Sequence, residues 1–144
     1  MASIDELWKI VRAAAGERAA AQAAHNGDGH SASSDTELAA KAQKYLRMRR
    51  KRADLFGADL FADPAWDIML DLFAAGIEGR VVSITSACIA SGVPTTTALR
   101  WVALLVSRGT ICRIPDSRDH RRSYLFLSDE AKTVMSEWLR VYPG

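Results

Sequence analysis

The sequence predicts a mainly α-helical fold that carries one small β-hairpin, and three observations lead to this class. Apolar residues recur at spacings of three and four through most of the 144 residues, which is typical of amphipathic helices. Only residues 111–114 and 123–127 form longer runs with the composition of strands, and a short polar stretch separates them. A capped helix follows the second run. The fold class is therefore α+β with helices predominating.

The composition is that of a folded chain whose charges are segregated along the sequence. Apolar residues make up 49% and charged residues 25%, and nineteen Lys and Arg against seventeen Asp and Glu leave a net charge of +2. Residues 35–57 carry seven basic and three acidic groups, and residues 81–128 carry six and two, so each segment has a net charge of +4. Residues 58–80 carry one and five, a net charge of −4. This pattern predicts one basic face.

Several classes of protein are excluded by the same residues. Cys88 and Cys112 are too few for a secreted disulfide scaffold, and no CxxC pair suggests a zinc or redox site. The first residues lack a basic stretch followed by an apolar one, so we expect no signal peptide. The uncharged stretch 81–99 holds seven Ser and Thr with a Gly and a Pro, which makes a poor membrane span. We expect a soluble cytoplasmic protein, associated with the nucleoid and not with a membrane.

Residues 1–34 are predicted to form an N-terminal helix and a flexible linker, separate from a domain over residues 35–144. An apolar stripe recurs at helical spacing and consists of Ile4, Leu7, Trp8 and Val11. A run rich in Gly, Ser, Asn and Asp over residues 25–34 then indicates a linker. Two interpretations of the stripe remain open. It docks on its own domain, or it forms a dimerisation element.

Helix start and stop residues divide the remaining domain. Ser34 or Asp35 caps a helix over residues 36–56, and Asp63 with Pro64 opens the next, which Gly79 ends. A short strand at 81–82 and a helix at 84–91, capped by Ser83, come next. After a turn at 92–94, a longer helix covers 95–108. Ser128 caps the last helix, 129–141. Trp66 and Met69, and in the longer helix Ala98, Trp101, Val102 and Leu105, are predicted to be buried.

A short helix, a glycine-containing turn and a longer helix form the arrangement that places one helix in the DNA major groove. The exposed N-terminal face of such a helix needs small polar and basic residues, and the longer helix offers Thr95, Thr96, Thr97 and Arg100 there. Threonine contacts phosphates or thymine methyl groups, and arginine binds guanine through two hydrogen bonds. The polar tip of the hairpin carries Arg118, Arg121 and Arg122, a set suited to the minor groove. Together these features predict a winged helix-turn-helix.

Residues 45–139 resemble the MarR-type winged-helix transcription regulators. The most specific match is Asp116-Ser-Arg-Asp-His-Arg121, which is similar to the D-x-R-D-x-R motif of that family, and residues 88–109 resemble its helix–turn–recognition helix. The resemblance implies a homodimer on a pseudo-palindromic operator, acting as a repressor that a small-molecule effector relieves. It further implies that Thr96, Thr97 and Arg100 face the major groove, that Arg118 and Arg121 serve the wing, and that Asp116 orients the neighbouring arginine.

This chain departs from the family in its N-terminal helix and linker. The family dimerises through helices at both ends of the domain, so the dimer is expected to be built differently here. Ile4, Leu7, Trp8 and Val11 are the residues we expect in that interface.

No catalytic, cofactor or metal-binding pattern accompanies these features. Asp67 and Asp71 lie one helical turn apart at what are predicted to be ordinary surface positions, and His25, Asp28 and His30 lack a fourth ligand. We therefore expect no enzyme, no cofactor and no metal. The basic run 47–52 is interpreted as a solvated surface, with phosphate contact as the alternative. Both cysteines are predicted to be buried and inert, with a redox switch as the alternative.

The predicted function is sequence-specific binding of double-stranded DNA to regulate transcription. Two alternatives from other classes remain. The second half of the longer helix, 103–106, is apolar, which suits a winged helix that docks on a partner protein. A non-specific architectural DNA binder would have the same fold but no preferred site.

Overall fold

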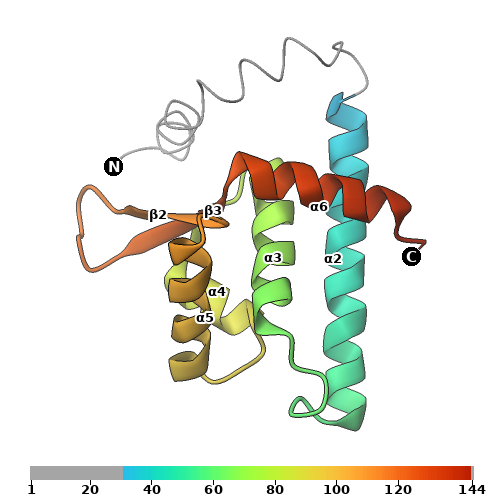
Figure 1. Ribbon diagram of the computed structural model, residues 1–144, viewed down its shortest axis with the longest axis horizontal. Coiled ribbons are helices and arrows are strands. Elements are labelled where there is room, and N and C mark those ends of the chain that lie inside the picture. Colours follow the sequence, from blue (N-terminus) through green and yellow to red (C-terminus); the bar gives the residue numbers. More distant parts are fainter. Residues whose placement is uncertain (1–30, 144) are drawn as a thin grey trace.

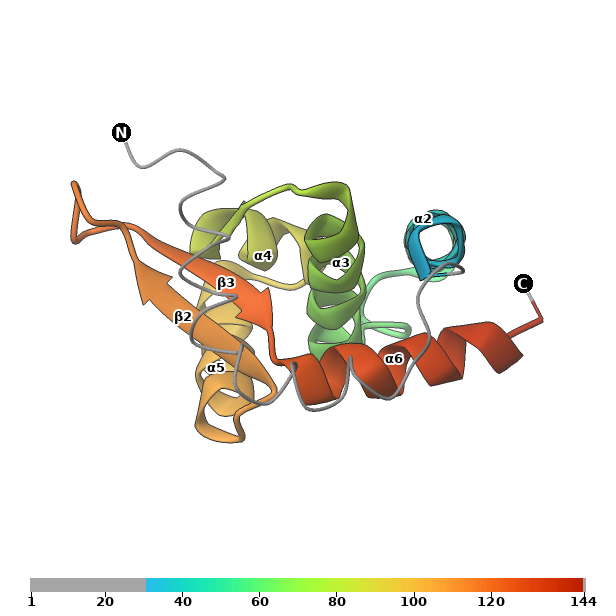
Figure 2. The ribbon, with the colours of Figure 1, turned by 90° about the horizontal axis from the view of Figure 1, so that it is seen from above.

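The computed structural model describes residues 31–143, and Figures 1 and 2 show their arrangement from two directions. The elements, in chain order, are α2 (Ser31–Phe56), α3 (Pro64–Glu78), β1 (Val82–Ser83), α4 (Ile84–Ala90), α5 (Thr95–Ser107), β2 (Ile111–Pro115), β3 (Ser123–Leu127) and α6 (Asp129–Val141). In Figure 1, α2 and α3 stand side by side, α6 crosses in front of both, and the β2–β3 hairpin projects beside α4 and α5. The predicted winged helix-turn-helix is confirmed.

Helix α3 lies at the centre because two hydrophobic clusters share it. On one side Leu70, Phe73 and Ala74 pack with α2 and α6, and on the other Ile68, Leu72 and Ala75 pack with the helix-turn-helix and the sheet. The partners on the first side are Leu38, Ala39, Ala42, Leu46, Met135 and Leu139. The partners on the second side are Val82, Ala87, Val102, Leu105, Ile111 and Leu125. The helix-turn-helix and the sheet are thereby fixed to the rest of the domain through one helix.

The predicted caps at Ser83, Ser128 and Gly79 are confirmed, whereas Ser34 and Asp35 lie inside α2 and Asp63 precedes α3 without a side-chain capping hydrogen bond. The Ser83 hydroxyl accepts a hydrogen bond from the Ser86 backbone N–H at 3.1 Å, and the Ser128 hydroxyl accepts one from Ala131 N–H at 3.2 Å. Gly79 ends α3 with a left-handed φ of 74°. Helix α2 begins at Ser31, earlier than the predicted residue 36, because residues 31–35 contain only Ser, Ala and Asp and no glycine or proline interrupts them.

The three strands form one antiparallel sheet in the order β1-β3-β2. Arg113 on β2 is opposite Leu125, which in turn pairs with Val82 of β1, and Ser83 is opposite Tyr124. Paired residues share a face of the sheet, and successive residues alternate between faces. Arg113 therefore lies on the same face as the buried Leu125 and Ile111, which packs against the helices.

A buried ion pair joins α2 to the first turn of α3. The Arg49 Nε lies 2.6 Å from Asp67 Oδ1, and only 11% of each side chain is exposed. The guanidinium also faces the Tyr45 ring at 5.7 Å, and its Nη2 is 3.8 Å from Asp63 Oδ2. Burial raises the pKa of Asp67 above its ordinary value, and the adjacent Arg49 opposes that rise.

Two sequence predictions are wrong at this pair. Arg49 does not belong to a solvated basic run, although Arg47, Arg50, Lys51 and Arg52 around it are exposed. Asp67 is not a surface residue, since it is 7% exposed. Both faces of α3 are covered, so a carboxylate on its first turn is buried and needs a cation within reach.

Within residues 31–143, no single helix is long and apolar enough to cross a membrane. The α4 and α5 pair reaches the required length and composition together, but its two helices are bent by 110° at the turn between them.

The ion pair gives a first prediction for stability. Arg49→Met leaves the buried Asp67 carboxylate without its cation, and we expect a loss of about 3 kcal/mol in the free energy of unfolding at pH 7. Urea denaturation measures this loss, with the exposed Arg47→Met as the matched control, expected to change stability by less than about 0.5 kcal/mol. The double variant Arg49→Met with Asp67→Leu removes both charges and should recover much of the loss.

The same variant should show a pH dependence of known sign. Without Arg49, the pKa of Asp67 rises further in the folded state. Between the ordinary pKa of 3.8 in the unfolded chain and the raised pKa in the folded chain, only the folded state keeps Asp67 protonated. Stability is then lost as the pH rises through that interval. The deficit of Arg49→Met relative to the wild type should therefore be smaller in mildly acidic buffer than at pH 7. An equal deficit at both pH values would contradict the assignment.

Candidate DNA interface

The exposed side of α5 carries the residues predicted to enter the major groove. Ala98, Val102 and Leu105 face the core, while Thr95, Thr96, Thr97 and Arg100 are all exposed. A helix advances by about 100° per residue, so positions 96, 100, 103 and 107 form one ridge opposite the buried stripe. That ridge presents a threonine, an arginine, an alanine and a serine. These side chains can approach base edges without filling the groove.

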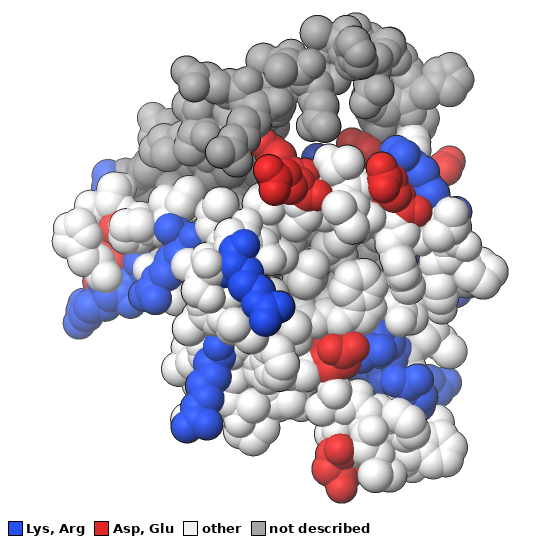
Figure 3. All heavy atoms as spheres, in the orientation of Figure 1, with Lys and Arg blue, Asp and Glu red and all other residues white. Residues whose placement is uncertain are grey.

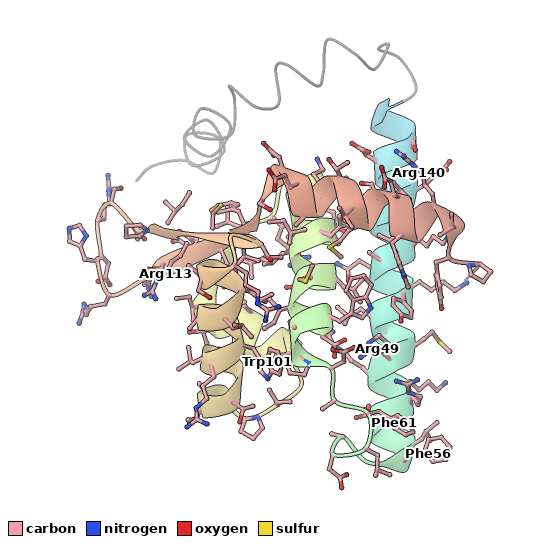
Figure 4. All side chains as sticks on the ribbon, viewed as in Figure 1. Arg49, Phe56, Phe61, Trp101, Arg113 and Arg140 are labelled. Carbon is pink, nitrogen blue, oxygen red and sulfur yellow. The ribbon has the colours of Figure 1, made fainter. Side chains whose placement is uncertain are left out.

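The flanks of α5 are more apolar than a groove-reading helix requires. Leu99, Trp101 and Leu104 remain 44%, 36% and 38% exposed. Trp101 was predicted to be core, and this is wrong, because it lies about 60° from Ala98 around the helix and the core contacts only a narrow stripe. Figure 4 shows Trp101 on the side of α5 turned toward α3.

Hydrogen bonds from two aspartates hold the wing tip in one conformation. Asp116 Oδ1 accepts from the Arg118 backbone N–H at 2.9 Å, and its Oδ2 accepts from the Tyr124 hydroxyl at 3.1 Å. Asp119 Oδ1 accepts from the Arg121 backbone N–H at 3.1 Å and from its Nε at 3.0 Å. The chain between β2 and β3 is thus tied at both aspartates, and the carboxylates face the protein.

Titration of Asp116 and Tyr124 reflects the same contacts. The hydrogen bond from the Arg118 backbone N–H is the main cause that lowers the pKa of Asp116, and the Tyr124 hydroxyl adds to it. Donation to this carboxylate raises the pKa of Tyr124. Both pKa shifts favour the charged Asp116 carboxylate and the protonated Tyr124 phenol. The hydrogen bonds of Asp116 to Arg118 N–H and to the Tyr124 hydroxyl, called the wing brace below, are therefore both present at neutral pH.

The wing presents its arginines to solvent. Arg118, Arg121 and Arg122 are exposed, and 91% of the Arg121 side chain is accessible although its Nε is bonded to Asp119. The sequence prediction overlooked Arg113, which is exposed on the helix-facing side of β2. Figure 4 shows Arg113 under the wing, beside the upper end of α5. The alternation of β2 could have indicated it, because Arg113 follows the buried Ile111 by two residues.

Basic side chains form two groups on the face shown in Figure 3, whereas the sequence predicted one basic face. One group lies over α5 and the wing and the other over the lower half of α2, and acidic side chains gather over the beginning of α6 and the upper end of α2. Arg108, which follows α5, is exposed and adds to the basic residues. The surface therefore combines groove-sized side chains on α5 with arginines on two sides of it.

The cysteines differ in their surroundings. Cys88 on α4 is buried, and burial raises the pKa of its thiol, which makes it a poor nucleophile at neutral pH. Cys112 on β2 is exposed. The prediction that both are buried is wrong at Cys112, which lies on the edge strand β2 and on the face of the sheet opposite Ile111.

An apolar cavity of about 320 Å³ lies between α3, α6 and the turn that follows α5. Trp66 and Trp138 meet edge to face there, with ring centroids 5.0 Å apart. The other apolar lining residues are Met69, Val134 and Met135, and the polar ones include Arg108, Thr110 and Ser128. Trp66 and Met69, predicted as core, are partly buried and pack against the cluster between α2, α3 and α6.

The remaining predicted residues lie outside the described part of the chain. Ile4, Leu7, Trp8 and Val11, the dimerisation candidates, belong to residues 1–30, as do His25, Asp28 and His30.

The sequence matches no protein-family model and no curated protein. Similar solved structures include heme-free PefR, with 23% identity and a TM-score of 0.46 over 68% of this chain and 82% of that one. The heme sensor protein PefR from Streptococcus agalactiae with bound heme gives the same identity and TM-score, over 68% of this chain and 65% of that one. The transcriptional regulator Tm0710 from Thermotoga maritima gives 22% and 0.43, over 72% and 65%. Likeness at this level concerns the fold alone.

Proposed function

We propose that this protein is a transcription regulator that binds double-stranded DNA at a specific sequence as a homodimer. One observation carries the proposal. The ridge of α5 that contains Thr96 and Arg100 lies beside a wing whose arginines are held outward by Asp116 and Asp119. A helix that fits a major groove and an arginine ribbon that fits the adjacent minor groove can bind one DNA site together.

The roles of the two groups of residues differ physically. Arg100, with Thr95, Thr96 and Thr97 around it, is placed to read base edges and so to supply sequence discrimination. Arg118 and Arg121 lie in the strong negative potential of the minor groove, and Arg122 lies beside them at the root of the wing, so that all three supply mainly electrostatic affinity. The homodimer follows from the family resemblance, and we propose the stripe of Ile4, Leu7, Trp8 and Val11 as part of its interface. Repression is the proposed outcome, because a dimer on an operator blocks access to a promoter.

A protein-interaction module is the second candidate, and the exposed Leu99, Trp101 and Leu104 on α5 favour it. The two functions differ in their response to salt. Contacts to DNA phosphates weaken steeply as salt is added, whereas an apolar interface does not. A third possibility, an architectural DNA binder, would bind every sequence with equal affinity.

The cavity beside Trp66 is the proposed site of a small-molecule effector. Its wall includes Arg108 and Thr110, directly after α5, and the Ser128 backbone N–H donates to Thr110 O at 2.9 Å. A ligand in this cavity would touch both the end of the groove-reading helix and the start of α6. The lining is mainly aromatic and aliphatic, with one cation, Arg108, and one carboxylate, Glu130, which suits a predominantly apolar ligand.

The function is tested first by selecting bound fragments from genomic DNA with the purified protein. Enrichment of a short inverted repeat is expected, because a two-fold dimer binds two half-sites. On that operator, Arg100→Ala should weaken binding by about 1–3 kcal/mol relative to random DNA. Arg118→Ala should weaken operator and random DNA alike and lower the salt slope by about one. A loss for Arg118→Ala confined to the operator would contradict the division of roles.

The wing brace gives a prediction opposite to simple electrostatics. Asp116→Ala removes a negative charge near the DNA, which alone would raise affinity. It also removes the acceptor for Arg118 N–H and the Tyr124 hydroxyl, so the wing must be ordered on binding and we expect affinity to fall about tenfold. Fluorescence anisotropy with labelled operator measures this change. Tyr124→Phe, which removes only one of the two bonds, should have a smaller effect, and an increase in affinity for Asp116→Ala would refute the role of the brace.

The effector site is tested with an aromatic anion, 1-anilinonaphthalene-8-sulfonate. Its fluorescence should rise on binding, and Ala131→Trp, which fills the cavity lined by Ala131, should abolish that rise. Substitution of the exposed Val141→Trp at the end of α6 adds the same indole outside the cavity and serves as the control. Equal dye binding by both variants would place the dye elsewhere.

A further inference from the structure

A second cleft lies between the root of the wing and the beginning of α4, apart from the ridge of α5. It encloses about 490 Å³, and residues of β1 and α4 meet residues of the wing along it. The side chains that line it are Ser83, Ile84, Thr85, Arg121, Arg122, Ser123 and Tyr124. These residues lie close together because of the register of the sheet, in which β1 pairs with β3 and Ser83 is opposite Tyr124. Ser83 and Tyr124, 41 positions apart in the chain, therefore belong to one polar, basic concavity.

Some hydroxyl groups that line this cleft already have hydrogen-bond partners in the described part of the chain, and others do not. The Ser83 hydroxyl caps α4 and is bonded to Ser86, and the Tyr124 hydroxyl is bonded to Asp116. The Thr85 hydroxyl is exposed, and in residues 31–143 it has no hydrogen-bond partner. Arg122 is exposed on the opposite wall, and its charge is close enough to Asp116 to lower the pKa of that carboxyl.

Both acidic groups near the cleft are already engaged. Asp116 accepts from the Arg118 backbone N–H and the Tyr124 hydroxyl, and Asp119 accepts from Arg121. Two guanidinium groups and a threonine hydroxyl thus face a concavity several times larger than the ~30 Å³ of a water molecule. Guanidinium and hydroxyl donors around an open space are suited to a phosphate group.

We propose that this cleft binds a phosphate of the DNA backbone, with Thr85 and Arg122 as its principal donors. The proposal rests on the function proposed above and adds a third contact to it, besides the α5 ridge and the wing tip. If the wing tip enters a minor groove, a phosphate that borders that groove passes the root of the wing. Contact there would fix the register of the helix-turn-helix on the duplex without reading sequence.

The experiment uses the full chain and the selected operator, with Thr133 of α6 as the matched control position because it is also an exposed threonine. Thr85→Val, which removes only the hydroxyl, should lower operator affinity about tenfold. Thr85→Lys should raise affinity for operator and random DNA alike and steepen the salt slope by about one. Thr133→Val and Thr133→Lys should change neither quantity. Thermal unfolding of each variant confirms that it is folded.

Neutral methylphosphonate linkages, introduced one at a time along the operator, identify the phosphate itself. We expect a methylphosphonate at one position bordering the wing to lower the operator affinity of the wild type about tenfold. The same linkage should leave the operator affinity of the Thr85→Val, Arg122→Gln double variant unchanged. The same methylphosphonate penalty in both proteins, or equal effects of Thr85→Lys and Thr133→Lys, would overturn the proposal while leaving the proposed function intact. A wild type that binds no DNA would overturn both.

A free anion is the other source of a phosphate group. If inorganic phosphate raises the melting temperature of the wild type but not of the double variant, and no methylphosphonate distinguishes the two proteins, the cleft is a free anion site. That combination would also overturn the proposal. We expect instead that inorganic phosphate, at ionic strength matched with chloride, stabilises both proteins equally.

Discussion

The burial of α3 on two opposite sides is the constraint on which the rest of the structure depends. Its residues alternate between the cluster shared with α2 and α6, which contains Phe73, and the cluster shared with the sheet and α5, which contains Leu72. Its remaining acidic residues, Asp71 and Glu78, pair with the partly exposed Arg80, whereas its buried carboxylate, Asp67, is paired with Arg49 from α2. The ion pair is thus a consequence of where α3 lies, and it is costly to break because neither charge can return to water without opening the helix pair.

This central position also connects the two parts of the candidate mechanism. Leu72 and Ile68 hold the helix-turn-helix, and Phe73 and Leu70 hold the scaffold of α2 and α6. The cavity next to Trp66 opens where these two halves meet, at the turn after α5. A ligand in this cavity would contact α6 and the turn that follows α5 at the same time. The cavity is therefore placed where a bound ligand could link the scaffold to the ridge of α5 that we propose to contact DNA.

The order of the elements could be predicted from the sequence because it depends on local signals. Ser83, Gly79 and Ser128 mark helix ends through hydrogen bonds and backbone angles that involve only neighbouring residues, and the motif between residues 116 and 121 marks the wing. Arg49 and Trp101 could not be placed in this way. Whether Arg49 is in a basic surface run or in an ion pair depends on α3, eighteen residues away. Trp101 lies on the correct side of α5 for burial, but the narrow contact of α5 with the core leaves it partly exposed.

The placement of charges explains how a chain with a net charge of only +2 can present a surface for DNA. Two acidic side chains near the wing, Asp116 and Asp119, accept hydrogen bonds from the wing itself. Their carboxylates therefore fix the conformation of the loop that carries Arg118 and Arg121. They reduce the attraction of the wing for phosphates, and in return the arginines need less ordering when DNA binds. Attraction to phosphates contributes to binding of every DNA sequence, so the two aspartates lower the non-specific affinity. The ordered wing loses less conformational entropy on binding, so the affinity of the specific complex falls little. The proposed regulator, which has to find one site among many, would gain from that difference.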